Sequence, residues 1–142
     1  MTRIIIGDNA LATLQAPSLA DLEALAGAAY AALPSRFTRL CEGLVIKVED
    51  FPEDEVLEEM ECETEYDLLG LFRGQGLTQG EHLAQTGDPA NMIWLFRRPI
   101  IDYWADGEDT LQEIVTHVLV HEIGHHFGLS DEDIEEIERK AG

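Results

Sequence analysis

Apolar residues at helical spacing predict three main helices along the chain. The first begins after the N-cap residue Ser18 and ends before Pro34. The second is a long, largely apolar helix at about 109–127, which Gly128 ends by adopting a left-handed conformation. The third is a short, acidic helix at about 130–140. The pattern therefore places most of the predicted regular structure in helices.

Two further stretches have the character of strands. Residues 44–49 alternate between apolar and polar side chains, which predicts a half-buried strand. Residues 92–96 are continuously apolar, as expected of a buried strand. Together with the helices they predict an α+β fold, in which helices pack against a small sheet. We expect a single domain over residues 1–142, with 1–17 as a loose lead-in that contains a short strand at Arg3–Ile6.

The excess of acidic over basic residues limits the kinds of molecule that the protein is expected to bind. The chain has nine Lys and Arg against 29 Asp and Glu, a formal net charge of -20. Such a charge excludes nucleic acid and anionic membranes as expected partners, because both require basic patches. It allows metal ions and a peptide or protein substrate of basic character. Eleven acidic residues between Glu49 and Asp67 are interpreted as a solvated excursion that contains a short exposed helix at about 53–60.

The remaining composition favours a cytoplasmic protein. Cys41 and Cys62 form neither a C-x-x-C pair nor a metal-ligand spacing, which is typical of free thiols in a reducing compartment. The first apolar run ends at Gly7, so it is too short for the hydrophobic part of a signal peptide. No apolar run approaches the roughly 20 residues of a membrane span.

The most informative residues lie in the long helix, where His121-Glu122-Ile123-Gly124-His125 forms an H-E-x-x-H pattern. Helical positions four apart differ by about 40° in direction, so both imidazoles can hold one metal ion. Glu122 flanks that ion without having to bind it, which is where a base can take a proton from a metal-activated water. The alternative is a pair of core histidines that form ordinary hydrogen bonds, with Glu122 paired to an arginine.

A third ligand can come from the residues after the helix. Catalytic zinc sites usually have three protein ligands and one open position. Gly128 allows a sharp turn, so Asp131 can return toward the metal. The other interpretation of Asp131 is an acid that stabilises the first turn of the last helix. Glu135, Glu138 and His117 are the rival third ligands.

Other side chains near the motif have two interpretations each. His126 either packs beside a ligand or donates a hydrogen bond to the reacting group, and Tyr103 either stabilises an oxyanion or is a core aromatic. Arg97 and Arg98 either bind a substrate carboxylate or form salt bridges with surface acids. For strand 92–96 we hypothesise an exposed edge that pairs with an extended peptide.

The run from His121 to Asp131 matches H-E-x-x-H-x-x-G-x-x-D, the zinc signature of the zincin metallopeptidases in its aspartate-ending form. Segments 94–100 and 119–131 resemble the small bacterial zincin-like metallopeptidase family, long described only as a domain of unknown function. A softer similarity extends over most of residues 18–140. The resemblance implies a zincin-like domain with a buried active-site helix.

The resemblance also implies roles for individual residues. Zinc is the expected cofactor, with His121, His125 and Asp131 as its ligands and Glu122 as the catalytic glutamate. The prediction is a zinc-dependent hydrolase, namely a metallopeptidase that uses zinc-activated water with Glu122 as general base. The alternative is a non-catalytic, metal-containing module that binds or regulates a peptide.

Overall fold

The computed structural model describes residues 10–74 and 91–141, so the strand expected at Arg3–Ile6 lies outside the described residues. Helices and strands alternate irregularly along the chain, which is the α+β organisation expected from the sequence. In chain order the elements are η1 (Ala10–Thr13), α1 (Leu19–Ala31), α2 (Ser35–Thr38), η2 (Arg39–Cys41), β1 (Val45–Glu49), α3 (Asp54–Glu59), β2 (Gly70–Gly74), β3 (Asn91–Phe96), α4 (Arg97–Asp106), α5 (Leu111–His126) and α6 (Asp131–Ala141).

The three strands form one sheet in the order β1-β3-β2. β1 runs parallel to β3, and β2 runs antiparallel to it. β3 is therefore the central strand with a neighbour on each side, and the hypothesis that strand 92–96 has an exposed edge is wrong. Ile93 and Leu95 of this strand are buried and the alternating Met92 and Trp94 are half-buried, so neither face of β3 is fully exposed.

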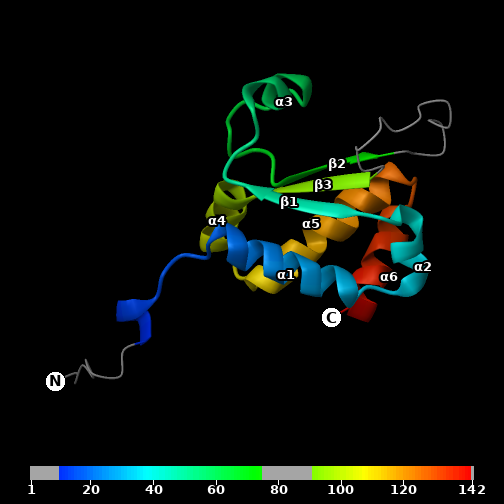
Figure 1. Cartoon of the computed structure of the whole chain (residues 1–142), viewed down its shortest axis with the longest axis horizontal. Coiled ribbons are helices and arrows are strands. Elements are labelled where there is room, and N and C mark those ends of the chain that lie inside the picture. The colour runs from blue at the N-terminus through cyan, green and yellow to red at the C-terminus, as the bar shows by residue number, and fades with distance from the viewer. Residues whose placement is uncertain (1–9, 75–90, 142) are drawn as a thin grey trace.

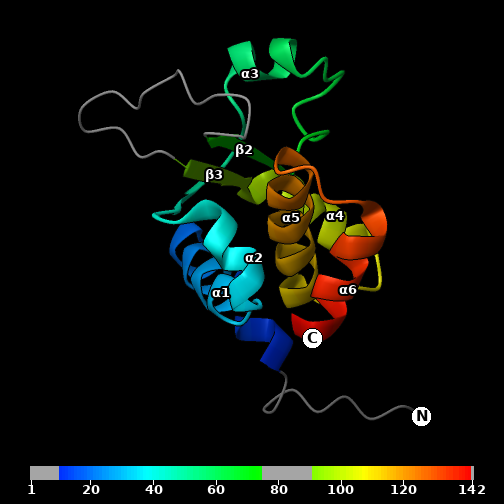
Figure 2. The same ribbon diagram turned by 90° about the vertical axis from the view of Figure 1, so that its right-hand side faces the viewer.

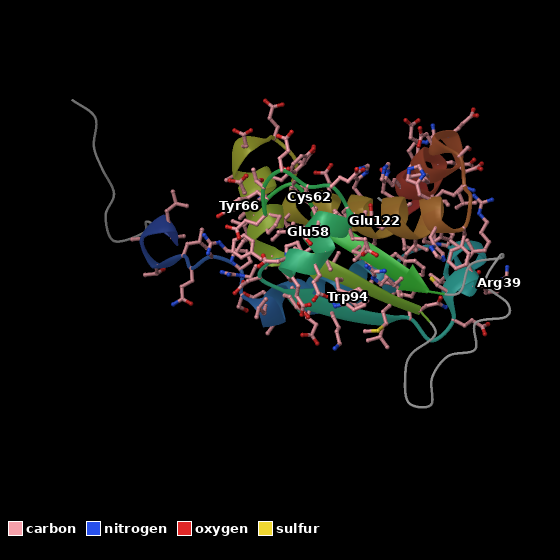
Figure 3. All side chains as sticks on the ribbon, turned by 90° about the horizontal axis from the view of Figure 1, so that it is seen from above. Arg39, Glu58, Cys62, Tyr66, Trp94 and Glu122 are labelled. Carbon is pink, nitrogen blue, oxygen red and sulfur yellow. The ribbon has the colours of Figure 1, made fainter. Side chains whose placement is uncertain are left out.

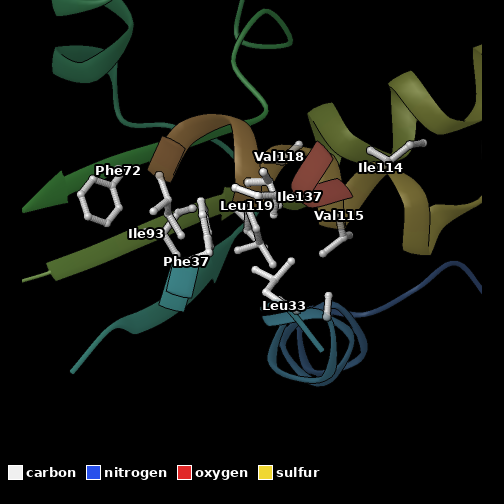
Figure 4. Close-up of a cluster of buried hydrophobic side chains, with 14 of the residues drawn as sticks. Leu33, Phe37, Phe72, Ile93, Ile114, Val115, Val118, Leu119 and Ile137 are labelled. Atoms are coloured by element: carbon white, nitrogen blue, oxygen red, sulfur yellow. The ribbon is translucent and has the colours of Figure 1, made fainter. Parts of the chain in front are cut away.

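The helices divide unequally between the two faces of the sheet. Figures 1 and 2 show α1, α5 and α6 on one face, with α3 over the opposite one. The register places Ile46, Ile93 and Phe72 side by side across the three strands. Figure 4 shows Phe72 and Ile93 turned toward Leu119 of α5 and Phe37 of α2. This apolar layer holds α5 firmly against the sheet, since all of these side chains belong to one core cluster.

Local capping explains where the principal helices begin. Three helices, α1, α5 and α6, begin with a capping box, which is a reciprocal pair of hydrogen bonds. The side-chain hydroxyl of the cap residue accepts a hydrogen bond from the backbone N–H of the residue three positions later. The acidic side chain of that later residue accepts a hydrogen bond from the backbone N–H of the cap residue. The long helix consequently begins at Leu111, after its cap Thr110, and ends at His126 rather than spanning 109–127. The three cap pairs are Ser18 with Asp21, Thr110 with Glu113, and Ser130 with Asp133.

Two smaller expectations, for α3 and for the cysteines, are also met. α3 has no buried residue, as expected of a helix within the acidic excursion. Cys41 and Cys62 are both free, and the buried Cys41 thiol lies 3.1 Å from the Tyr30 hydroxyl. η1 projects away from the other helices in Figure 1. No helix within the described ranges is both long enough and apolar enough to cross a membrane.

Candidate active site

Helix α5 presents the H-E-x-x-H residues on the side that does not pack into the core. Val118, Leu119 and Val120 just before the motif are buried. His121 and Glu122 are half-buried, and His125 one turn further on is exposed. Figure 3 shows Glu122 on α5, next to the sheet. The buried residues thus fix the helix while the polar residues of the motif keep access to solvent.

The imidazoles of His121 and His125 face each other. Their Nε2 atoms lie 3.1 Å apart and their ring centroids 4.3 Å apart. Two ligands of one tetrahedral zinc ion, each about 2.1 Å from the metal, are separated by about 3.4 Å. The pair is therefore close to the separation that a shared zinc ion requires. The spacing of four residues on one helix accounts for this approach.

Asp131 approaches the same pair from the first turn of α6. Its Oδ1 lies 3.5 Å from His125 Nε2, and its side chain is 82% exposed. Two hydrogen bonds close the turn between the helices, from Leu129 N–H to the Gly124 carbonyl and from Gly128 N–H to the His125 carbonyl. Gly128 has φ of +79°, the left-handed conformation expected from the sequence. The turn thereby directs the start of α6 back toward the histidines.

The rival third ligands are placed differently. Glu138 Oε1 lies 2.7 Å from His117 Nδ1, so these two groups form a pair of their own. The His117 ring lies one turn below His121, at 4.9 Å between centroids. Within residues 10–74 and 91–141, three or more His, Cys, Asp or Glu side chains do not converge as a preformed metal cluster. The contacts are pairwise, of His125 with His121 and with Asp131, and the imidazole and carboxylate groups are of the types that zinc accepts as ligands.

The electrostatics of His121 keep it in the neutral form that a metal requires. Burial is the main cause that lowers the pKa of His121, and the nearby charges of His125 and His117 lower it further. The carboxylates of Asp131 and Glu138 act in the opposite direction. His121 Nδ1 is buried and has no hydrogen-bond partner among the described residues. Among the described residues, His121 thus has a partner for Nε2, which is His125, and none for Nδ1.

Glu122 has the environment of a general base. Burial raises the pKa of its carboxyl group, an effect that the charges of His125 and His117 partly offset. Among the described arginines, those with ion pairs bind Glu136, Glu59 and Asp50 rather than Glu122. The alternative in which an arginine neutralises Glu122 thus finds no support in the described ion pairs. A half-buried carboxylate with a raised pKa suits proton transfer near neutral pH.

A cavity of about 470 Å³ adjoins this carboxylate. It follows α5 from the His121 and Glu122 side chains to Glu113, and the start of β2 forms part of its wall. Both apolar side chains and carboxylates line the cavity, and among the described residues neither Lys nor Arg does so. The apolar contributors include Leu68, Leu69, Ile114 and Val118, and the acidic ones besides Glu122 are Asp67, Asp109, Glu113 and Glu138.

The structure also places the other side chains for which the sequence left two interpretations. Tyr103 is 54% exposed and lines the cavity, so its interpretation as a core aromatic is wrong. His126 packs edge-on against Phe72, at 4.6 Å between ring centroids, and burial lowers its pKa. Arg97 donates to Asp50 at 3.0 Å, as a salt bridge does, while the Arg98 guanidinium lies over the Phe51 ring. The packing and salt-bridge interpretations therefore describe His126 and Arg97.

Sequence reasoning missed the acidic wall of the cavity. A signal for it was present, because Glu113, His117, His121 and His125 are each four residues apart and follow one side of α5. Three residues of that polar stripe, Glu113, His117 and His121, line the cavity. The contribution of β2 to the cavity depends on strand pairing and has no comparable local signal.

Comparison with known families adds an independent finding. A family model for zincin-like metallopeptidases matches residues 41–141. The matched range includes all three strands, the whole of α5 and Asp131. A search of curated proteins found no match to the chain. Because the family model covers well over half of the sequence, the chain belongs to the zincin-like metallopeptidase family.

Proposed function

We propose that the protein is a zinc-dependent peptidase in which His121, His125 and Asp131 hold the metal and Glu122 is the general base. The observation that carries the proposal is the 3.1 Å separation of the two histidine Nε2 atoms directly beside a half-buried glutamate. Membership of the zincin-like family supports the same reaction class. When bound, zinc supplies a Lewis acid that acidifies a water molecule and polarises a carbonyl group.

Glu122 performs the proton transfers. Its carboxylate accepts a proton from the attacking water and then donates that proton to the leaving amine of the cleaved peptide. The raised pKa supports both steps, because a carboxyl group with a pKa closer to neutrality is a better base and still returns its proton readily. Its position on α5 next to His121 keeps it beside the metal ligands without competing for the same coordination site.

Asp131 completes the ligand set by a side-chain movement. Its carboxylate is largely exposed and already 3.5 Å from His125 Nε2, so rotation of the side chain meets little packing resistance. A carboxylate oxygen is an accepted zinc ligand. Glu138 is the weaker candidate because its carboxylate is engaged with His117.

The cavity beside Glu122 supports basic peptides as the substrate class. Its carboxylates attract a cationic side chain, and the apolar residues Ile114 and Val118 suit the aliphatic part of lysine or arginine. Asp109 has no ion pair or hydrogen bond among the described contacts, so its charge remains available to a ligand. We therefore propose that substrates carry a basic residue next to the cleaved bond.

Zinc content and turnover together test the proposal. We expect about one zinc per chain in the wild type purified without a metal-affinity tag, and loss of that zinc in His121→Ala. Glu122→Gln should retain zinc but cleave a basic peptide library at least about 100-fold more slowly, the usual contribution of a general base. Glu55→Gln on α3 is the matched control and should behave as the wild type.

Two outcomes would contradict the proposal in different ways. A protein that binds no zinc even when zinc is supplied would overturn the metal assignment. A zinc-loaded wild type that binds peptides but cleaves none of them would instead favour the non-catalytic binding module.

A further inference from the structure

Gly124, within the H-E-x-x-H motif, lies where α6 makes its closest approach to α5. A Cβ atom built on Gly124 would lie 2.9 Å from Cγ1 and 3.0 Å from Cδ1 of Ile134. Both separations are too short for two carbon atoms in contact, so an alanine at this position would displace Ile134. Ile134 is 2% exposed and thus has little free space into which it can move.

The absence of a side chain at Gly124 needs a reason. Glycine in the middle of a helix is unfavourable compared with alanine, because it loses more backbone freedom on folding. Gly27 in α1 provides the contrast, since no described atom lies within 4 Å of the position that a Cβ atom would take there. The close contact with Ile134 supplies the reason at Gly124.

The same contact lies close to Asp131 along α6. Ile134 is three residues after Asp131 on α6, so both residues project toward the same side of that helix. Gly124 immediately precedes His125, whose Nε2 is 3.5 Å from the Asp131 carboxylate. Movement of Ile134 away from Gly124 would therefore carry Asp131 away from His125.

A second contact fixes the other half of α6. Glu138 accepts a hydrogen bond from His117 Nδ1 at 2.7 Å, and Ile137 is buried in the main core. With its second half tied to α5 in this way, α6 cannot move freely as a whole. A displacement of Ile134 thus acts mainly on the first turn of α6, where Asp131 lies.

We propose that Gly124 is a positioning residue, which admits Ile134 and thereby sets the distance of Asp131 from the histidines and the affinity for zinc. This inference rests on the proposed function, in which Asp131 is the third ligand. Its effect is on zinc binding by the resting protein, so it can be measured without a substrate.

The test is the zinc dissociation constant, measured by competition with a chelator on the full chain. We expect Gly124→Ala to bind zinc at least about tenfold more weakly, the usual effect of altering a group that supports a ligand. Gly27→Ala is the matched control, because it adds the same methyl group to a helix without a contact, and should bind as the wild type. Circular dichroism establishes that each variant is folded.

A double-variant cycle tests whether Ile134 transmits the effect. Ile134→Ala removes both atoms that the new methyl group would meet, so adding Gly124→Ala to that variant should change the zinc affinity by less than about twofold. If Gly124→Ala does not fold, Ile134→Ala alone keeps the test decisive. It should weaken zinc binding more than Ile100→Ala, which removes an equally buried isoleucine from α4.

The possible failures can be told apart. If Asp131→Ala weakens zinc binding but Gly124→Ala binds as tightly as the wild type, Gly124 does not position the ligand and only this inference is overturned. If Asp131→Ala itself binds zinc as tightly as the wild type, Asp131 is not a ligand and the proposed metal site fails together with the inference.

Discussion

The carboxylate of Asp131 lies 3.5 Å from His125 Nε2, although the chain reverses direction between the two residues. This proximity depends on a short turn that begins where α5 ends. Gly128 adopts φ of +79° within that turn, and the hydrogen bonds from Gly128 and Leu129 close it onto the last turn of α5. The backbone after the motif therefore places Asp131 beside the motif.

Gly128→Ala should destabilise the protein through its backbone alone. No described atom lies within 4 Å of the place where the new Cβ atom would lie, so the expected cost of about 1–2 kcal/mol comes from placing a side chain in the left-handed region. Urea unfolding of the metal-free protein measures this loss. Gly27→Ala, in a regular helix, is the control and should be neutral or slightly stabilising. Equal stability of Gly128→Ala and the wild type would show that the turn tolerates another conformation.

Zinc affinity should be nearly constant above neutrality and decrease in acid. Protons compete with zinc for imidazole nitrogen, and the pKa of His121 is lowered from its ordinary value of 6.5. His121 thus stays neutral to a lower pH than an exposed histidine does. We expect the affinity to decline only below about pH 6.5. A zinc titration at several pH values checks this, and a decline that begins well above neutral pH would contradict it.

The same shift affects the stability of the metal-free protein. Because the folded-state pKa of His121 is below the unfolded value, the unfolded chain binds more protons in the interval between the two. The contribution of His121 to stability is therefore complete above pH 6.5 and is lost as the pH falls toward the lowered value. Glu122 has a raised pKa and acts with the opposite sign, since its contribution is lost as the pH rises from 4.5 through that raised value.

Asp109→Asn should weaken the preference for basic peptides. It removes one negative charge from the cavity, and an exposed charge pair contributes about twofold to fivefold in affinity. Cleavage of matched basic and neutral peptides measures the preference. Asp106→Asn removes a charge from the end of α4 outside the cavity and should have a smaller effect. The preference should also decrease with added salt, and a preference independent of salt would contradict the electrostatic explanation.

Much of the fold could be predicted because its signals are local. The caps Ser18 and Thr110 and the left-handed Gly128 depend on neighbours within one helical turn, and the predicted helices lie within a few residues of the observed ones. The spacing of His121 and His125 likewise depends only on helix geometry, so their approach was predictable.

Non-local pairing could not be predicted in the same way. The pattern of residues 92–96 indicates a buried strand, but it does not reveal which strands lie beside it. β3 consequently proved central rather than exposed at an edge. The placement of Tyr103 at the cavity rather than in the core also depends on how α4 packs.

The sequence by itself determined the chemical groups of the candidate site, because a helix places residues four apart on one side in any fold. The return of Asp131 toward His125 was also predictable from the local turn at Gly128, whereas the tertiary structure alone decided that Ile134 occupies the space above Gly124. That contact arises from the docking of α6 on α5, and the sequence pattern of neither helix indicates where the two will touch.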